Sequence, residues 1–127
     1  MVRNQIVDPY FPTCPIRNIL SRMGEKWTLL VLLVLNNNNS CRFNKLQKAI
    51  PDISQRMLTT TLRSLEGDGL IHREVYAEMP LRVEYSLTDR SRSLMLLIEP
   101  LVDWSINNYN GIISDRKAFD KNTSKSK

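Results

Sequence analysis

The stretch "ISQRMLTTTLRSLEGDGLIHR", Ile53 to Arg73, decides the fold, because its apolar period changes along the way from that of a helix to that of a strand. Ser54 is a good N-cap, and apolar residues follow it at helical spacing, at Leu58, Leu62 and Leu65. Gly67 and Gly69 end this helix. The sequence therefore predicts a helix that leads at once into a strand.

The side of this helix that faces away from its leucines has a distinctive composition. At 100° per residue it carries short polar side chains and two guanidinium groups, at Arg56, Thr59, Thr60 and Arg63. Threonine is a poor helix former, and it stands here where Glu or Lys would favour the helix. A solvated face is the ordinary outcome for an isolated amphipathic helix, whereas this composition favours a surface that binds a partner.

Two helices are predicted near the N-terminus, well before this stretch. Pro15 takes a first helical position and Gly24 ends the first helix, whose apolar residues are Ile16, Ile19, Leu20 and Met23. The run from Lys26 to Leu35 is too continuously apolar for a surface helix, so we expect a buried one. The four asparagines at 36–39 end it in a loop.

A short helix, "CRFNKLQKAI", comes directly before the deciding stretch. Ser40 is expected to cap it, and Pro51 forbids its continuation. Its apolar residues share one side, at Phe43, Leu46 and Ile50. This helix and the one that follows Ser54 are joined by a tight turn, which is a helix-turn-helix pattern.

Beyond Gly69 the sequence predicts a hairpin and a last helix. Alternation in "LIHREVY" and "RVEYSL" indicates two strands, the first with Ile71, Arg73 and Val75 on one face, and "AEMPL" reads as the loop between them. Thr88 is expected to cap a long helix with an apolar stripe at Leu94, Leu97, Leu101 and Trp104. The fold class is mainly α with a β-hairpin wing, a winged helix-turn-helix with N- and C-terminal dimerisation elements.

The composition indicates one globular domain with an unevenly distributed charge. The chain has 127 residues, 42% of them apolar, and a net charge of +5. Residues 40–65 carry five Lys and Arg against one Asp, whereas residues 66–89 carry six acidic groups against two arginines. The positive excess therefore lies on the two helices of the helix-turn-helix, where an anionic partner would be attracted.

Several classes of protein are excluded by the same sequence. The longest apolar run, "WTLLVLLVL", is too short to cross a bilayer, and the start lacks the apolar segment of an export signal, so we expect a cytoplasmic protein with no membrane contact. Two cysteines and one histidine cannot supply four zinc ligands. No phosphate loop or nucleophile elbow occurs, so we expect no metal, no cofactor and no enzymatic activity.

Four segments in a fixed order resemble one family: "CPI" from Cys14, "GEKWTLLVL" from Gly24, "RFNKLQKAIPDISQRMLTTTLRSLEGDGLIHREVY" from Arg42 and "RVEYSLT" from Arg82. They make the chain similar to the HxlR-type regulators, winged-helix transcription factors related to the MarR group. The resemblance implies a homodimer that binds double-stranded DNA at a palindromic operator. The resemblance covers a winged helix-turn-helix domain with its dimerisation helix (14–112), which follows an N-terminal arm (1–13). The basic, polar composition of residues 113–127 predicts a disordered tail.

Roles for the polar residues follow from the chemistry of DNA. Arg56 and Arg63 can each donate two hydrogen bonds to guanine, and Gln55 can pair with adenine. Thr59 and Thr60 can each contact a thymine methyl group or a phosphate. Phosphate contacts that set the register are expected from Arg42, Lys45 and Ser54. Arg82 is the candidate reader of the minor groove.

The two thiols form a second constellation. Pro15 makes Cys14 the N-cap of the first helix, where the helix dipole and Arg17 favour the thiolate. Some HxlR-type regulators sense oxidants or electrophiles through a cysteine at this position, so the resemblance implies a redox sensor. The equally weighted alternative is a buried packing residue. Cys41 is interpreted as structural, although it could form a disulfide with an oxidised Cys14 across a dimer.

The surplus apolar surface of the last helix predicts the dimer interface. Leu97, Leu101 and Trp104 are expected to pack against the second protomer, together with residues of the arm, at Ile6, Tyr10 and Phe11. The alternative to a DNA-binding regulator is a winged-helix module that contacts other proteins, which would not require the Arg and Thr face. Salt-dependent retention on DNA separates the two.

Overall fold

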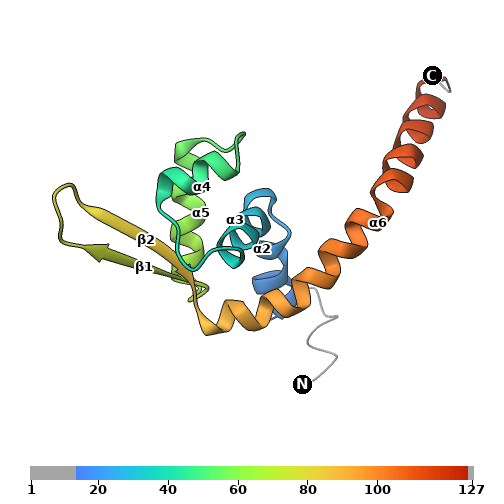
Figure 1. The fold of residues 1–127 in the computed structure, drawn as a ribbon. Coiled ribbons are helices and arrows are strands. Elements are labelled where there is room, and N and C mark those ends of the chain that lie inside the picture. Colours follow the sequence, from blue (N-terminus) through green and yellow to red (C-terminus); the bar gives the residue numbers. More distant parts are fainter. Residues whose placement is uncertain (1–13, 126–127) are drawn as a thin grey trace. The chain divides into compact units, whose positions relative to one another are not determined.

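The computed structural model describes the backbone of residues 14–125 and the side chains of residues 14–123 (Figure 1). It divides into one unit that ends at Arg92 and a second that begins at Ser93. The first unit holds the predicted helix-turn-helix and hairpin, and the second holds most of the last helix. None of the helices described is long and apolar enough to span a membrane.

The two predicted N-terminal helices are present. The first is wound as a π-helix, η1 (Ile16–Leu20), and continues as the short α-helix α2 (Ser21–Met23), with Gly24 as its C-cap. The second is α3 (Lys26–Asn36), in which Val31, Leu32 and Leu35 are buried. At its end the Asn38 side chain donates a 2.7 Å hydrogen bond to the Val34 carbonyl, so the asparagine run does end this helix.

The helix-turn-helix consists of α4 (Phe43–Ala49) and α5 (Gln55–Gly67). The Ser54 hydroxyl accepts a 3.0 Å hydrogen bond from the Met57 N–H, which confirms the expected cap. The buried side of α5 is also as expected, with Leu58, Leu62 and Leu65 at 2% exposure or less. An ion pair between Arg22 and Asp68, 2.7 Å long, ties the C-cap of α5 to α2.

The predicted cap of α4 is wrong. Ser40 lies two residues before the N-cap, which is Arg42, and the Arg42 side chain makes no capping hydrogen bond. The reason is that Cys41 is held in an extended bridge to Tyr85, with N–H to O distances of 2.8 Å in both directions. A residue paired with a strand cannot also be the first residue of a helix, so α4 starts later.

The hairpin has the predicted strands. β1 (Ile71–Tyr76) pairs antiparallel with β2 (Arg82–Leu87) in a register that places Ile71 opposite Leu87 and Arg73 opposite Tyr85. The turn from α5 into β1 requires Gly69, whose φ of +72° lies in the left-handed region. A Cβ atom there would also lie 2.7 Å from an Arg90 guanidinium nitrogen.

The last helix, α6 (Asp89–Lys125), begins as predicted and extends further than predicted. Thr88 caps it, since its hydroxyl accepts from the Ser91 N–H at 3.4 Å while the Ser91 hydroxyl accepts from the Thr88 N–H at 2.9 Å. The expectation of a disordered tail from 113 is wrong for residues 113–125, which are helical. A helix that is already formed propagates through good helix formers such as Arg116, Lys117 and Ala118 at little cost.

The buried side of α5 generates a prediction about stability. Leu58→Ala should lower the free energy of unfolding by about 2–5 kcal/mol, because Leu58 is fully buried and its truncation leaves a cavity. Met57→Ala is the matched control, since Met57 is 40% exposed and should change stability by less than about 1 kcal/mol. Urea unfolding followed by circular dichroism measures both values. Equal losses would mean that the leucine stripe does not face the core.

Candidate nucleic-acid interface

The outward face of α5 is built as the sequence predicts. Arg56, Thr59, Thr60 and Arg63 are exposed, whereas the leucines on the other side are buried. Each threonine hydroxyl donates to a carbonyl of its own helix, Thr59 to Gln55 at 2.9 Å and Thr60 to Arg56 at 3.0 Å. Their lone pairs and methyl groups therefore stay available to a partner.

The N-terminal half of α5 gathers most of the predicted contact residues around one hollow. This hollow has a volume of about 630 Å³ and is lined by Ser54, Gln55, Arg56, Thr59 and Thr60. The Ser54 hydroxyl only accepts in its capping bond, so its hydrogen can be donated to an anion. The start of a helix also presents free N–H groups and the positive end of the dipole, which favours a phosphate here.

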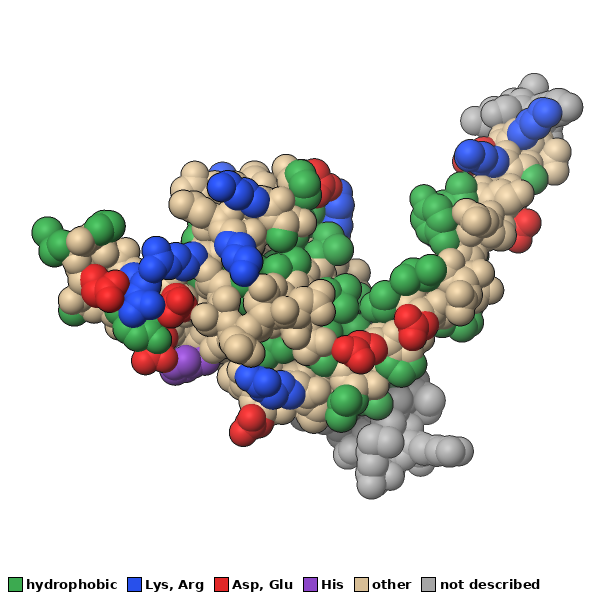
Figure 2. All heavy atoms as spheres, in the orientation of Figure 1, with side chains coloured by type: hydrophobic (Ala, Val, Ile, Leu, Met, Phe, Trp, Pro, Cys, Tyr) green, Lys and Arg blue, Asp and Glu red, His purple; other side chains and the backbone are tan. Residues whose placement is uncertain are grey.

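The cations of α4 flank this face. Arg42 is exposed at the N-cap of α4, and the Lys45 ammonium group donates a 2.9 Å hydrogen bond to the Asn38 side-chain oxygen. Figure 2 shows Lys and Arg side chains over α4 and α5, while the hairpin carries basic and acidic groups side by side. The charge separation that the sequence indicates is therefore also a separation in space.

Arg82 is placed differently from the other predicted contacts. Its guanidinium group stacks on the Tyr76 ring at 3.8 Å, and two carboxylates approach it, Glu78 at 3.0 Å and Glu84 at 3.5 Å. Its Nε lies close to Glu78 without hydrogen-bond geometry. Desolvation, with Glu74 and Glu84 adding to it, raises the pKa of Tyr76, so this ring stays neutral beside Arg82. Arg82 is thus neutralised and held against the hairpin.

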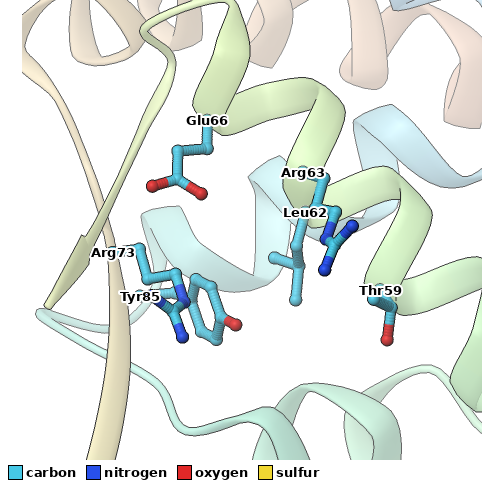
Figure 3. A pocket seen from close by; sticks show the side chains of 6 residues that line it. All are labelled: Thr59, Leu62, Arg63, Glu66, Arg73 and Tyr85. Carbon is cyan, nitrogen blue, oxygen red and sulfur yellow. The ribbon is translucent and has the colours of Figure 1, made fainter. Parts of the chain in front are cut away.

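A second hollow lies between α5 and the hairpin (Figure 3). It has a volume of about 340 Å³ and is lined by Thr59, Leu62, Arg63, Glu66, Arg73 and Tyr85. Arg63 and Glu66 of α5 are thus brought together with Arg73 of β1 and Tyr85 of β2. The sequence did not indicate three of these as site residues: Glu66, Arg73 and Tyr85. One signal could have found Arg73, because it interrupts the apolar register of Ile71 and Val75 on the first strand.

Both cysteines are buried, Cys14 at 3% and Cys41 at 2% exposure. Cys14 directly precedes the helical residue Pro15, and its carbonyl accepts a 3.0 Å hydrogen bond from the Asn18 N–H, so it occupies the predicted place at the helix start. Burial raises the pKa of the Cys41 thiol, and Lys45 only partly opposes this effect. Cys41 is therefore a protonated thiol at neutral pH, and its backbone supports β2.

The predicted interface residues of α6 are exposed along that helix. Leu97 is 72% exposed, and Leu101 and Trp104 are each 57% exposed. Figure 2 shows further hydrophobic side chains along α6, and Ile106, Tyr109 and Phe119 are more than half exposed. The other predicted interface residues, Ile6, Tyr10 and Phe11, lie outside the described residues.

Comparison with known proteins gives one consistent match. The sequence profile of the family described as HxlR-like helix-turn-helix matches residues 22–112. The HTH-type transcriptional regulator YdeP of Bacillus subtilis is 47% identical over 94 residues, which cover 74% of this chain and 73% of YdeP.

Two solved structures are similar to this fold. The reduced form of the redox regulator HypR is 38% identical, with a TM-score of 0.73 over 79% of this chain and 98% of HypR. The reduced form of the transcriptional regulator YodB from B. subtilis is 32% identical, with a TM-score of 0.65 over 72% of this chain and 90% of YodB.

Proposed function

We propose that this chain, which belongs to the HxlR-like helix-turn-helix family, is a homodimeric regulator that binds a palindromic DNA operator through the outward face of α5. The family is one of transcriptional regulators, and a helix-turn-helix implies DNA as the partner. Because the partner is chromosomal DNA, we place the protein in the cytoplasm. The exposed Arg and Thr face of α5, opposite a fully buried leucine stripe, is the observation that carries the proposal.

In this proposal α5 lies in the major groove and reads bases with its exposed side chains. Arg56 and Arg63 donate to guanine, Gln55 pairs with adenine, and the threonines contact thymine methyl groups or phosphates, at Thr59 and Thr60. Arg42, Lys45 and Ser54 bind phosphates and set the register. Arg82 can read the minor groove only if it leaves the two carboxylates that hold it.

A protein-binding module is the alternative, and its fold would be the same. Such a module would have no use for four exposed Arg and Thr side chains on the second helix, and it would not respond to salt as a DNA-binding protein does. Selecting bound sequences from random duplexes tests the proposal directly. Enrichment of a sequence with two-fold symmetry supports it, and failure to retain any duplex at low salt contradicts it.

Base reading by α5 leads to the first functional prediction. Arg63→Ala should cost about 1–3 kcal/mol on the preferred site and relax specificity at one base pair, because a bidentate contact to guanine is lost. Lys45→Ala is the comparison, since loss of a phosphate contact should weaken all sequences alike and reduce the salt slope by about one. Titrations by fluorescence anisotropy on selected and random duplexes measure both. Equal losses on the two duplexes for Arg63→Ala would exclude a base contact.

Dimerisation is proposed from the exposed stripe of α6. Leu97, Leu101 and Trp104 recur on one side of the helix, and covering them with a second copy would remove a continuous apolar surface from water. A two-fold axis would place the two copies of α5 about 34 Å apart, one turn of DNA, which matches a palindromic operator. The arm residues Ile6, Tyr10 and Phe11 are proposed to contribute to the same interface.

The oligomeric state is the corresponding prediction. The protein should sediment as a dimer at micromolar concentration, and Leu101→Asp should shift it to a monomer, because a buried unpaired carboxylate opposes association. Asn110→Asp adds the same charge half a turn away in angle and should leave the dimer intact. A monomeric parent protein would rule out this interface.

We also propose that Cys14 couples oxidants or electrophiles to DNA binding. The support is its place at the start of the first helix and the likeness of the fold to HypR, described as a redox regulator. A covalent change at Cys14 would alter the spacing of the two α5 helices if η1 lies near the dimer interface. Moving the dimer from mostly competent to mostly incompetent requires about 5 kcal/mol, which a new covalent bond can supply.

Thiol chemistry tests this coupling. Cys14 should be alkylated faster than Cys41 in the native protein, because the raised pKa of Cys41 keeps that thiol protonated until the pH rises well above neutral. Treatment with a quinone or diamide should change DNA affinity in the parent and in Cys41→Ser, but not in Cys14→Ser. If Cys14 reacts only after unfolding, it is a packing residue and not a sensor.

A further inference from the structure

Arg73 occupies a position of the hairpin that would ordinarily hold an apolar residue. Ile71, Arg73 and Val75 lie on one face of β1, and Ile71 on that face is buried at 3% exposure. Arg73 pairs across the hairpin with Tyr85, so the two side chains project from the same face. Figure 3 shows both of them at the hollow below α5, with Arg63 and Glu66 on its other side.

The two cations of this hollow, Arg63 and Arg73, have no polar partner among the described side chains. Among residues 14–123 neither Arg63 nor Arg73 has a side-chain hydrogen bond or ion pair. Arg82 contrasts with them, because it lies on the opposite face of the hairpin and is neutralised by Glu78 and Glu84. The hairpin therefore directs its available positive charge toward α5 through Arg73.

The lining of the hollow favours a phosphate as its occupant. Pockets for small organic ligands are mainly apolar, whereas five of the six residues here carry polar groups. Guanidinium groups recognise the oxygens of a phosphate by paired hydrogen bonds, and the phenol of Tyr85 can donate another. Thr59 and Arg63 also belong to the face of α5 that is proposed to enter the major groove, so a phosphate that reaches this hollow belongs to the DNA backbone.

We infer that Arg73, assisted by Tyr85, binds a backbone phosphate of DNA beside α5, and that Glu66 weakens this contact by repulsion. The inference rests on the proposed function and adds residues that the sequence did not select. Glu66 is exposed, lines the same hollow and has no ion pair among the described side chains. A phosphate contact carries no information about the base sequence, so Arg73 and Glu66 should change the affinity for all DNA sequences alike.

Charge-removing variants of the hairpin test the contact. Arg73→Gln should lower affinity for a random-sequence duplex by about tenfold, the usual effect of losing a hydrogen bond to a charged group. It should also reduce the slope of log K against log salt by about 0.9, the value for one phosphate. Arg82→Gln is the matched control, because it removes the same charge from the opposite face of the hairpin, where two carboxylates already neutralise it. The slope of log K against log salt should change less for Arg82→Gln than for Arg73→Gln.

Glu66→Gln provides a test in the opposite direction. It should raise affinity for random and selected duplexes by the same factor, about threefold, as expected for removal of one unit-charge repulsion across several ångströms of a water-like medium. Because Glu66 is exposed, this variant should fold even if Arg73→Gln does not. No change in affinity for Glu66→Gln, or equal slope changes for Arg73→Gln and Arg82→Gln, would overturn the inference.

Two further outcomes separate the possible failures. If Arg56→Ala loses DNA binding and Arg73→Gln binds like the parent, the proposed function stands and the phosphate contact is wrong. A different outcome is that inorganic phosphate raises the melting temperature of the parent but not of Arg73→Gln, while the two proteins have equal slopes of log K against log salt. In that case the hollow binds a free anion and not the DNA backbone. A parent protein that retains no duplex refutes the proposed function itself.

Discussion

Burial of the leucine stripe of α5 is the constraint on which the candidate interface depends. Leu58, Leu62 and Leu65 can reach the core only if the opposite side of the helix faces solvent, so the same packing presents Arg56, Thr59, Thr60 and Arg63 together. A helix of 13 residues is marginal on its own in water, and threonine weakens it further. Tertiary packing therefore supplies the stability that the outward face gives up.

The second constraint is the backbone bridge between Cys41 and Tyr85. It joins the segment before α4 to β2, so the helix-turn-helix and the hairpin are held together by paired main-chain groups. Tyr85 also lines the hollow below α5, and its cross-strand partner is Arg73. The bridge thus fixes the position of the hairpin residues that face α5, and burial of Cys41 follows from its place in this bridge.

Local signals in the sequence predicted the elements well, whereas long-range pairing was not predictable from them. The strand bounds, the Ser54 cap and the Thr88 cap depend on neighbouring residues, and the structure confirms them. Ser40 has the right chemistry for a cap, but a strand 44 residues away holds Cys41 extended, and no pattern near Ser40 indicates this. Composition alone predicts a disordered tail from residue 113, because it takes no account of how readily an established helix continues.

The two arginines of the hairpin also show that local sequence cannot predict which side chain is available to bind DNA. Arg82 and Arg73 are both arginines on short strands, and composition ranks neither above the other. Register separates them, because it places Arg73 with Tyr85 on the face toward α5 and Arg82 with Tyr76 on the other. Glu78 and Glu84 neutralise the Arg82 guanidinium group through the folded arrangement of the hairpin, which composition does not indicate.

The acidic hairpin and the basic α5 affect DNA binding in different ways: the hairpin changes the overall affinity, and α5 determines the preference for a sequence. Repulsion between carboxylates and the DNA backbone acts on every sequence alike, so it lowers affinity without changing the ratio between specific and random sites. That ratio depends on base contacts, and the residues of α5 that can make them lie outside the acidic segment 66–89, at Gln55, Arg56, Thr59, Thr60 and Arg63. Substitutions in the hairpin should therefore shift the range of salt concentration over which the protein binds DNA, whereas substitutions on α5 should change which DNA it binds.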